Sequence, residues 1–478
     1  MSLRWRKAGS CARLLTVAAG MTGWLLAATA GALEIKMVPP TGGATTSAAS
    51  GVTPDGTIVV GNSNNELLKF DVATGASTSL GKPDTWTSAV AGYNGATLQG
   101  GSLCVSGSGV RSDGLTHGFW YQEGSPATWK DIGDIAGGDN YSVGNGISFD
   151  GNYLAATSND AADDCAARFN SPANSLLYLS RPPDRPTNGR AYGYDISYAG
   201  EAVVGWGDGF GKVEGWYCVL SNNKTYTLPS LPNPVIPRWH AFAMSADGIW
   251  VAGASSYEGA PTGNENCLKA VRWQVTDPTN VATPLDLGTG YEYGRAYPNA
   301  ISDYGHVIAG WHREANSSGQ FIGNQQAFVW DATNGMQDLQ AALVAALGTE
   351  VMNHWPVLTE VRSVSSDGTV LAGVGTYDVD GDAGTTADRY TRGFVVTGWP
   401  TPPISAPAAP AVASTSTWDV STSYPTATKV WFRHSVTPSD RCMVRRTFSS
   451  TEMIAPVAPS AAKTCISTCR SRRRSSEF

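Results

Sequence analysis

Three arginines occupy the same place in three successive segments of the sequence. Arg190, Arg238 and Arg295 each lie seven residues before an aligned Ser, in the stretches RAYGYDIS, RWHAFAMS and RAYPNAIS. A guanidinium group presents a planar fork of N–H donors that matches a carboxylate or a phosphate. We therefore predict that the three side chains converge on one face of the protein and bind an anionic group there.

A ring side chain follows each of these arginines two residues later: Tyr192, His240 and Tyr297. Flat rings beside a cation suit a sugar, so an acidic sugar is the ligand that this pattern favours. The alternative is structural, because each Arg could instead pair with an Asp or Glu of the neighbouring segment or donate to loop carbonyls. The spacing alone leaves both interpretations open.

A second set of polar side chains lies in the stretch DVDGDAGTTAD. Asp378, Asp380 and Asp382 alternate along a Gly-containing loop, a spacing that can wrap a hard cation such as calcium. The loop departs from the EF-hand pattern, because Ala383 stands at its sixth position and Arg389 at its twelfth, where a bidentate Glu would be needed. The alternative is a solvated acidic loop. Calcium is the one cofactor that the sequence suggests.

The motifs of common catalytic sites are absent. The chain contains no H-E-x-x-H or G-x-S-x-G sequence, and GWGDGFGKV (205–213) departs from the spacing of phosphate-binding loops. We therefore favour a binding module over an enzyme. Two alternatives stay open. The first is a hydrolase or lyase of acidic polysaccharides, in which the arginines bind a carboxylate and a Tyr or His acts as acid or base. The second is a structural repeat protein with protein partners.

The segments that carry these residues belong to a repeat. RSVSSDGTVLAGVGTYD (362–378) has six counterparts upstream, each predicted to be two strands joined by a tight turn, for which Asp-Gly favours type I′. The predicted turn glycines are Gly56, Gly95, Gly151, Gly200, Gly248, Gly305 and Gly368. Their mean spacing of 52 residues is close to the ~40–50 residues of a β-propeller blade.

Further strands complete each repeat. Runs rich in aromatic and β-branched residues, such as HGFWY (117–121) and QAFVW (326–330), predict a third strand, and LG-type runs predict a fourth. Four antiparallel strands per repeat predict an all-β, seven-bladed β-propeller over residues 33–400. The expected repeat units are 46–86, 87–138, 139–189, 190–237, 238–294, 295–356 and 357–400.

The seventh repeat lacks a fourth strand, because GFVVTGWPTPP runs directly into a Pro-rich segment. The isolated strand-like run LEIKMV (33–38) precedes the first repeat. We predict that this run closes the last blade and so removes an open sheet edge.

The strand order also predicts where ligands bind. Antiparallel strands place the loop after the second strand and the start of the first strand on one face, while the Gly turns lie on the other. The long loops and the three arginines therefore share a face. Binding residues are common on such loops because a rigid scaffold positions them.

The N-terminus predicts export. An apolar run (14–28) follows four basic residues, Arg4, Arg6, Lys7 and Arg13, and small residues after it allow cleavage after Ala32. Residues 1–32 are therefore predicted to be a signal peptide. No other run approaches the ~20 apolar residues of a membrane helix, so no transmembrane anchor is expected in the mature chain. We expect a periplasmic, cell-surface or extracellular protein.

Charge limits the partners. Residues 33–400 hold 19 Lys and Arg against 36 Asp and Glu, a net charge of −17, which argues against nucleic acid. The expected partners are a glycan, a cell-surface polymer or a protein, and the expected state is a monomer. Residues 401–478 begin as a Pro/Ala-rich linker, end as CRSRRRSSEF and are predicted to be disordered.

Four cysteines fall within the repeats: Cys104, Cys165, Cys218 and Cys267. After export they could form one or two disulfides, or they could remain buried free thiols. The spacing does not choose between these states.

The stretch QAFVWDATNGMQDLQ, followed by SVSSDGTVLAGV, resembles the HAF family of bacterial extracellular repeat proteins. The resemblance covers about 46–400, although only THGFW keeps the family's His, at His117. It implies a secreted or surface β-propeller, sometimes the passenger of an autotransporter. It implies no particular activity.

Overall fold

The structure is a computed structural model that describes residues 32–401, except 161–162, 182–188, 210–211, 262–263 and 383–385, and also residues 449–450 and 467–468. The chain divides into two units, 1–404 and 405–478. In the second unit the two described strands, β29 (Ser449–Ser450) and β30 (Ser467–Thr468), pair antiparallel. The predicted signal peptide up to residue 31 and most of the predicted disordered tail lie outside the described residues.

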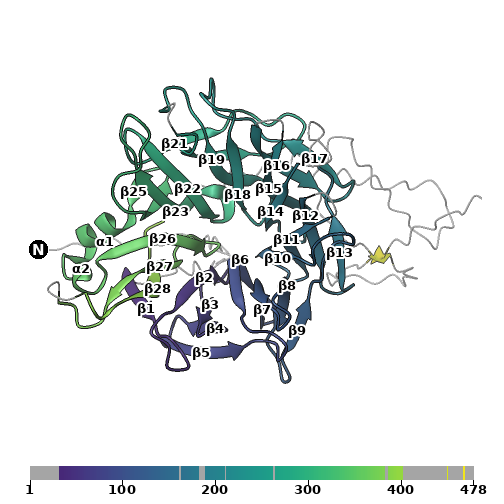
Figure 1. Cartoon of the computed structure of the whole chain (residues 1–478), viewed down its shortest axis with the longest axis horizontal. Helices are drawn as coiled ribbons and strands as arrows, with labels where there is room; N and C mark the ends of the chain where they lie inside the picture. Colours follow the sequence, from purple (N-terminus) through teal and green to yellow (C-terminus); the bar gives the residue numbers. More distant parts are fainter. Residues whose placement is uncertain are drawn as a thin grey trace, which may run out of the picture. The chain divides into compact units, whose positions relative to one another are not determined.

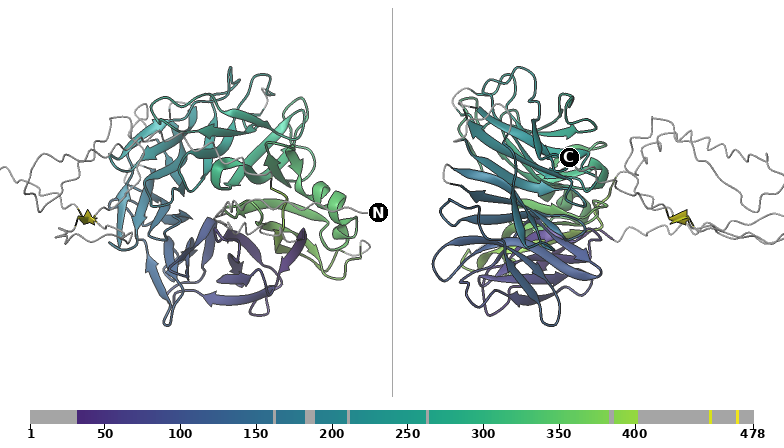
Figure 2. Two further views of the ribbon diagram at one scale, coloured as in Figure 1. Left: turned by 180° about the vertical axis from the view of Figure 1, so that it is seen from behind. Right: turned by 90° about the vertical axis from the view of Figure 1, so that its right-hand side faces the viewer.

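The first unit is a seven-bladed β-propeller, as the repeats predict (Figure 1). Seven four-stranded antiparallel sheets surround a central axis, and consecutive repeats form neighbouring blades. Figure 2 shows the ring from behind and from the side, where the strands run between its two faces. Blades are numbered 1 to 7 in the order of their innermost strands.

The strands are named from the axis outward. The innermost strands are β2 (Ala48–Val52), β6 (Val90–Gln99), β10 (Ser142–Ile147), β14 (Ala191–Ile196), β18 (Trp239–Met244), β22 (Gly294–Ile301) and β26 (Val357–Val364). The second strands are β3 (Ile58–Ser63), β7 (Ser102–Val110), β11 (Tyr153–Asn159), β15 (Ala202–Gly209), β19 (Trp250–Ser255), β23 (Val307–Glu314) and β27 (Leu371–Asp378). The third strands are β4 (Glu66–Asp71), β8 (Thr116–Gln122), β12 (Asp164–Asn170), β16 (Lys212–Val219), β20 (Lys269–Gln274), β24 (Gln326–Asp331) and β28 (Arg389–Thr397). The outermost strands are β5 (Ala76–Gly81), β9 (Thr128–Asp131), β13 (Ser175–Tyr178), β17 (Lys224–Thr227), β21 (Leu285–Gly288), β25 (Gly335–Asp338) and β1 (Glu34–Val38).

The predicted ring closure is confirmed. Strand β1 pairs antiparallel with β28, from Glu34 opposite Thr397 to Val38 opposite Gly393, and so supplies the outermost strand of blade 7. The N-terminal and C-terminal ends of the propeller therefore meet in one sheet. Because the ring is closed, each blade packs between two neighbours. A linear array of blades would instead leave exposed sheet edges that can pair with another chain.

The repeated Ser-x-Asp-Gly sequence forms a wider turn than the type I′ turn predicted from Asp-Gly. In blade 7 the positive φ of 77° falls on Gly368 and not on Asp367. The Ser365 hydroxyl donates to Asp367 at 2.7 Å and accepts from the N–H of Val370 at 3.0 Å, so side chains complete the turn. The prediction of type I′ was wrong because these side-chain hydrogen bonds stabilise a longer connection.

Blade 2 departs from the predicted repeat. Gly95 lies within β6, where three extra residues form a bulge between Ala91 and Ala96, and the hairpin turn instead falls at Gly100 and Gly101. Both of these glycines have positive φ, 59° and 85°, and Gln99 pairs directly with Ser102, as in a two-residue hairpin. Residues 103–116, which the strand order predicts to be one of the long loops, are therefore mostly part of β7. In this blade the Asn94-Gly95 pair lies in a bulge, and the Gly100-Gly101 pair forms the hairpin turn.

The turns of successive blades are hydrogen-bonded to one another around the axis. The N–H of Tyr198 in blade 4 donates to Ala246 of blade 5 at 2.7 Å, and the N–H of Ser366 in blade 7 donates to Pro54 of blade 1 at 3.0 Å. Equivalent bonds join blades 3 and 4 and blades 6 and 7. The repeated turn thus ties neighbouring blades together on this face, called here the turn face.

Four of the turn glycines also accept a hydrogen bond from a side chain in the third strand of the preceding blade. Four such bonds run from Trp120 to Gly151 (2.8 Å), Arg168 to Gly200 (3.1 Å), Tyr217 to Gly248 (3.1 Å) and Arg272 to Gly305 (2.6 Å). The donors are Trp, Arg or Tyr side chains, whereas the acceptor is a glycine carbonyl in each case. These glycines therefore form the hairpin turn and also contact the preceding blade.

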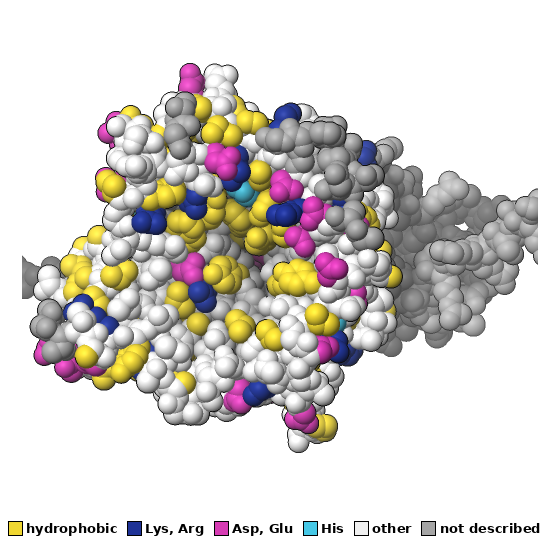
Figure 3. All heavy atoms as spheres, viewed as in Figure 1, with side chains coloured by type: hydrophobic (Ala, Val, Ile, Leu, Met, Phe, Trp, Pro, Cys, Tyr) yellow, Lys and Arg dark blue, Asp and Glu magenta, His cyan; other side chains and the backbone are white. Residues whose placement is uncertain are grey.

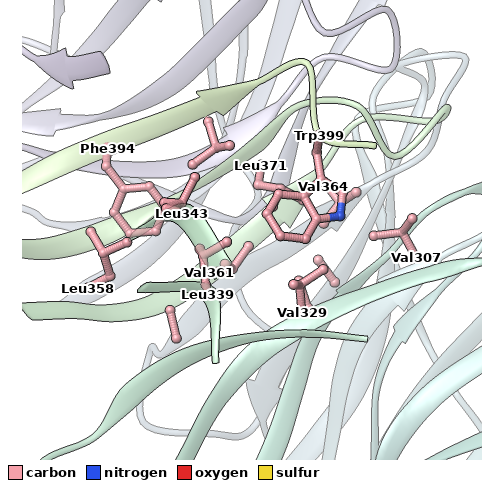
Figure 4. Packing of buried hydrophobic residues seen from close by; sticks show 14 of the residues in the cluster. Val307, Val329, Leu339, Leu343, Leu358, Val361, Val364, Leu371, Phe394 and Trp399 are labelled. Carbon is pink, nitrogen blue, oxygen red and sulfur yellow. The ribbon is translucent and has the colours of Figure 1, made fainter. Parts of the chain in front are cut away.

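The core is divided among the blade interfaces. Seven clusters of buried hydrophobic residues each lie between adjacent blades, the largest between blades 6 and 7. Two helices that the sequence did not predict, α1 (Leu339–Leu347) and α2 (Val351–His354), follow β25, and Leu339 and Leu343 of α1 enter this largest cluster beside Leu358 and Phe394 (Figure 4). A short 3-10 helix, η1 (Asp303–Gly305), forms the turn of blade 6.

The four cysteines of the propeller are buried free thiols. Burial raises the pKa of Cys104 and of Cys165 to about 12. Of the two states that the sequence left open, the structure therefore has the unpaired one.

Candidate functional site

The loops between second and third strands lie on the face opposite the turns, called here the loop face (Figure 3). Figure 3 shows a depression at the centre of this face. Hydrophobic side chains gather on its wall over the innermost strands of blades 4 to 6, and Lys and Arg side chains lie beside them. The three aligned arginines begin or directly precede the innermost strands of these three blades.

Seven rings form a continuous row along that wall. We name the row the aromatic wall, and its members are Tyr192, Tyr194, Trp206, His240, Phe242, Tyr297 and Trp311. Centroid separations along it are 4.5 Å from Tyr192 to Trp206, 4.9 Å from Trp206 to His240 and 5.0 Å from Tyr297 to Trp311. Most of these rings are only half-buried, so their faces can contact a ligand.

His240 differs from its neighbours because it is only 5% exposed. Burial, together with the charges of Arg238 and Arg295, lowers its pKa to about 3. The imidazole is therefore neutral at physiological pH and stacks on Phe242 with 5.4 Å between centroids. It supports the wall from behind and offers little surface to a ligand.

Arg190 is already paired with acidic side chains and is therefore not available to bind an anion. Its Nε donates to Asp163 of blade 3 at 3.1 Å, and its backbone N–H donates to Asp208 at 3.0 Å. The guanidinium is 53% exposed beside these acidic groups. This is the inter-blade ion pair that the sequence left open as the structural alternative. The nearby Tyr192 hydroxyl donates to Asp164 at 2.8 Å.

Arg238 is partly neutralised within its own blade. Its guanidinium forms an ion pair with Glu265 at 2.9 Å and donates to the side chain of Asn266 at 3.1 Å. Both partners lie in the loop between β19 and β20. Glu265 is more than half exposed, so it could move aside for a ligand.

Arg295 has no acidic partner among the described residues. Its Nε donates to the carbonyl of Asn266 at 2.8 Å, and its guanidinium lies over the rings of Phe321 (4.7 Å) and Tyr297 (5.1 Å). Burial lowers the pKa of Arg295, and the charges of Arg238 and Arg313 act in the same direction. An anion placed here would relieve this unfavourable electrostatic environment.

Arg313 joins this cluster, although the sequence repeat did not identify it. It pairs with Arg295 across strands β22 and β23, lies over the ring of Phe321 at 5.4 Å and donates to the carbonyl of Gly323 at 3.1 Å. Arg238, Arg295 and Arg313 therefore form a cationic cluster, and among the described residues its one carboxylate partner is Glu265. Such a cluster is unusual in a propeller with a net charge of −17.

The depression has a polar floor that the sequence also missed. The bulge of β6 carries Tyr93 across the axis, where its hydroxyl donates to Glu360 of blade 7 at 3.1 Å. Arg362 donates to the same carboxylate oxygen at 2.7 Å and lies 5.0 Å from the Tyr93 ring. Asn94 reaches the carbonyl of Asn299 in blade 6 at 2.9 Å. The bulge thus spans the central channel.

Tyr93 keeps its proton at physiological pH. The residue is 39% exposed, but burial of its hydroxyl raises the pKa to about 12. The Glu360 carboxylate contributes to the same shift. The floor therefore offers a hydroxyl, a carboxylate and a guanidinium to the depression.

The acidic loop is arranged differently from the predicted calcium set. Carboxylate oxygens of Asp378, Asp380 and Asp388 lie within 4.8 Å of one another, and Asp382 is not part of this group. Arg389 donates to Asp378 at 2.8 Å, and this hydrogen bond holds the pKa of Asp378 below its usual value. The guanidinium thus supplies positive charge where a cation would bind.

Comparisons with known proteins identify no family. No protein-family model matches the sequence, and no curated protein matches it. Similar solved structures include a putative TolB from Agrobacterium tumefaciens (16% identity, 54% of this chain and 88% of that chain, TM-score 0.37) and oligogalacturonate lyase from Vibrio parahaemolyticus (9% identity, 76% and 96%, TM-score 0.44). A third is the β-propeller domain of the Trilobed protease from Pyrococcus furiosus (7% identity, 60% and 78%, TM-score 0.36). Similarity at this level assigns no activity or ligand to the chain.

Proposed function

We propose that this protein is an exported or surface-associated β-propeller that binds a carboxylate-bearing glycan in the depression of its loop face. The observation that carries the proposal is the position of Arg295. Its guanidinium lies next to half-buried rings, is oriented by the Asn266 carbonyl and has no acidic partner among the described residues. A carboxylate bound by Arg295 and Arg313 would leave the sugar ring on Tyr297 and Trp311.

Export belongs to the proposal as well. The predicted signal peptide and the resemblance to the HAF repeat proteins support a periplasmic, cell-surface or extracellular location. Within the described part of the chain, no helix has the length and apolar character needed to cross a bilayer.

A glycan array tests the proposal directly. The full-length protein is applied to an array that contains uronate-, sialate- and sulfate-bearing glycans together with neutral glycans of matched structure. We expect binding to carboxylate-bearing glycans, and we expect it to weaken as salt increases because the contact is between charges. Binding to neutral glycans alone, or to no glycan, would contradict the proposal and favour a protein partner.

An enzyme is the second candidate, because the structure pairs a phenol with a carboxylate. The Tyr93 hydroxyl and Glu360 lie at the floor of the same depression and are hydrogen-bonded at 3.1 Å. Such a pair could transfer a proton during cleavage of an acidic polysaccharide. The test is to incubate the bound glycans with the wild-type protein and with Tyr93→Phe, and to look for shortened products by mass spectrometry. Products from the wild type but not from the variant would support an enzyme.

A further inference from the structure

A second hollow opens on the loop face between blades 2 and 3. It has a volume of about 370 Å³ and is lined by residues 114–116 and by Asp139, Asn140, Tyr141, Asn159 and Asp164. We name it the polar pocket. None of its lining residues is a Lys or Arg, so its chemistry differs from that of the cationic cluster in blades 5 and 6.

Hydrogen bonds hold parts of the polar pocket in place. The side chain of Asn159 accepts from the backbone N–H of Asp139 at 3.2 Å, which fixes the loop that precedes β10 against the end of β11. Asp164 is oriented by the Tyr192 hydroxyl, which donates to it at 2.8 Å. The remaining carboxylate and amide atoms can accept from or donate to a ligand.

The donor set indicates an uncharged, hydroxyl-rich ligand. Two carboxylates accept hydrogen bonds from hydroxyl groups and repel anions, while amide groups and the Tyr141 phenol can both donate and accept. Burial raises the pKa of Tyr141, so its hydroxyl stays protonated and can act as a donor. These are the contacts that a neutral sugar unit needs.

A hydrogen bond joins the polar pocket to the aromatic wall. Tyr192 donates to Asp164 of the pocket, and its ring is the first member of the wall, 4.5 Å from Trp206. The wall then continues over blades 5 and 6 to Trp311 and the cationic cluster. A ligand long enough to cover the wall would therefore reach both ends.

We propose that the polar pocket is a second subsite that binds a neutral sugar unit of the same glycan whose carboxylate lies at Arg295. This inference rests on the proposed function and adds to it a ligand class: an oligosaccharide with an acidic unit at one end and neutral units at the other. Free monosaccharides would occupy only one end of this site.

The test uses three probes and two variants of the full-length protein, measured by calorimetry. The probes are glucuronate, a glucuronate-terminated tetrasaccharide, and the same tetrasaccharide with its carboxylate reduced to an alcohol. The test variant is Asp139→Ala with Tyr141→Phe, because among the described residues only the backbone atoms of these two residues, and not their side chains, form hydrogen bonds. The matched control is Asp134→Ala with Tyr198→Phe, which changes the same residue types outside the pocket.

For the wild type we expect the acidic tetrasaccharide to bind at least ~10-fold more tightly than glucuronate, because two or three further hydrogen bonds are formed. The test variant should lose about tenfold in affinity for the tetrasaccharide and nothing for glucuronate. The control variant should bind all probes as the wild type does. A test variant that binds the tetrasaccharide as tightly as the wild type would overturn the second subsite and leave the proposed function standing.

The reduced tetrasaccharide separates the two proposals. If neither acidic probe binds but the reduced probe does, and the test variant loses that binding, the proposed function fails while the pocket stands as a site for neutral sugar. If none of the three probes binds the wild type, both proposals are overturned.

Discussion

Asp195 of blade 4 accepts a hydrogen bond from the backbone N–H of Met244 in blade 5, with 2.9 Å between Oδ2 and N. Its other oxygen accepts from the N–H of Ile196 at 2.9 Å. The carboxyl group is buried at the central cavity of the turn face, which is lined by residues of all seven blades. Burial raises the pKa of Asp195 from 3.8 to about 7, despite the two hydrogen bonds.

Asp195 should therefore make the propeller less stable as pH rises. Below about pH 4 the carboxyl is protonated in both the folded and the unfolded chain. Between about pH 4 and 7 it loses its proton only in the unfolded chain, so the free energy of unfolding decreases as pH rises. Above about pH 7 both states are ionised and the decrease ends. Urea unfolding across this range should show a loss of up to roughly 4 kcal/mol from this group. Asp195→Asn should flatten the profile. Substitution of the exposed Asp84 by Asn is the control, and an unchanged slope in Asp195→Asn would contradict the assignment.

The hydrogen bond from Arg272 to Gly305 should contribute strongly to stability. The Arg272 guanidinium donates at 2.6 Å and lies over Trp250 and Trp330, with 4.4 Å and 5.1 Å to the ring centroids. We expect Arg272→Ala to lower the free energy of unfolding by about 2–4 kcal/mol, because a buried carbonyl loses its donor and two rings lose their packing. Lys224→Ala removes an exposed cation near Tyr226 and should change stability by less than about 0.5 kcal/mol. Equal effects of the two substitutions would argue against the inter-blade role.

Two glycines with similar positive φ allow backbone strain to be distinguished from crowding at the repeated turn. Gly75 (φ 71°) has open space around it, whereas a Cβ on Gly368 (φ 77°) would lie 2.7 Å from Val307 Cγ2 of blade 6. Gly75→Ala should cost about 1 kcal/mol from the backbone alone. Gly368→Ala should cost about 1–3 kcal/mol more, because Val307 of the preceding blade must shift. Chemical denaturation of both variants measures the difference, and equal losses would show that blade packing at this turn is loose.

The two aligned arginines Arg190 and Arg295 should differ in function. Arg295→Gln should weaken binding of carboxylate-bearing glycans by at least ~10-fold, because a charge-assisted contact is lost. Arg190→Gln should change affinity less than about twofold, since Arg190 is paired with Asp163. Melting temperatures of both variants are recorded in parallel. Loss of binding in Arg190→Gln, or a collapse of melting temperature without a binding defect in Arg295→Gln, would assign the repeat position to structure instead.

The acidic loop should respond to calcium only after its arginine is removed. Arg389 already donates to Asp378 at 2.8 Å. We expect millimolar calcium to leave the melting temperature of the wild type unchanged and to raise that of Arg389→Gln, in which three carboxylates remain close together. If calcium raises the melting temperature of the wild type and Asp380→Asn abolishes the effect, the loop is a native calcium site.

The sequence was sufficient to predict the blades, because each repeat combines a two-residue alternation with a fixed turn. The strand β1 was predictable for a related reason: Leu33 to Val38 was the one unassigned strand, and blade 7 lacked one. The turn of blade 2 was not predictable in this way, because Asn94-Gly95 and Gly100-Gly101 are both acceptable hairpin turns. Which pair forms the turn depends on contacts across the axis, such as that between Asn94 and Asn299.

The site was predictable only in part. The repeat identified Arg190, Arg238 and Arg295 as equivalent positions, but their partners lie in loops that do not follow the repeat: Asp163, Glu265 and Asn266. The polar floor of the depression could not be predicted for the same reason. Tyr93 and Glu360 are 267 positions apart in the sequence and come into contact only across the propeller axis. Periodicity describes what the blades share, whereas the function proposed here depends on where they differ.

The pairing of β1 with β28 has a consequence for the order in which the protein can mature. The strand that closes the ring is the first of the propeller to be synthesised, and its partner is the last. Until residue 397 is available, β1 has nothing to pair with and the ring remains open, however well the earlier blades have formed. A chain interrupted before β26 would expose the flanks of blades 1 and 6 and would be more easily cleaved by proteases.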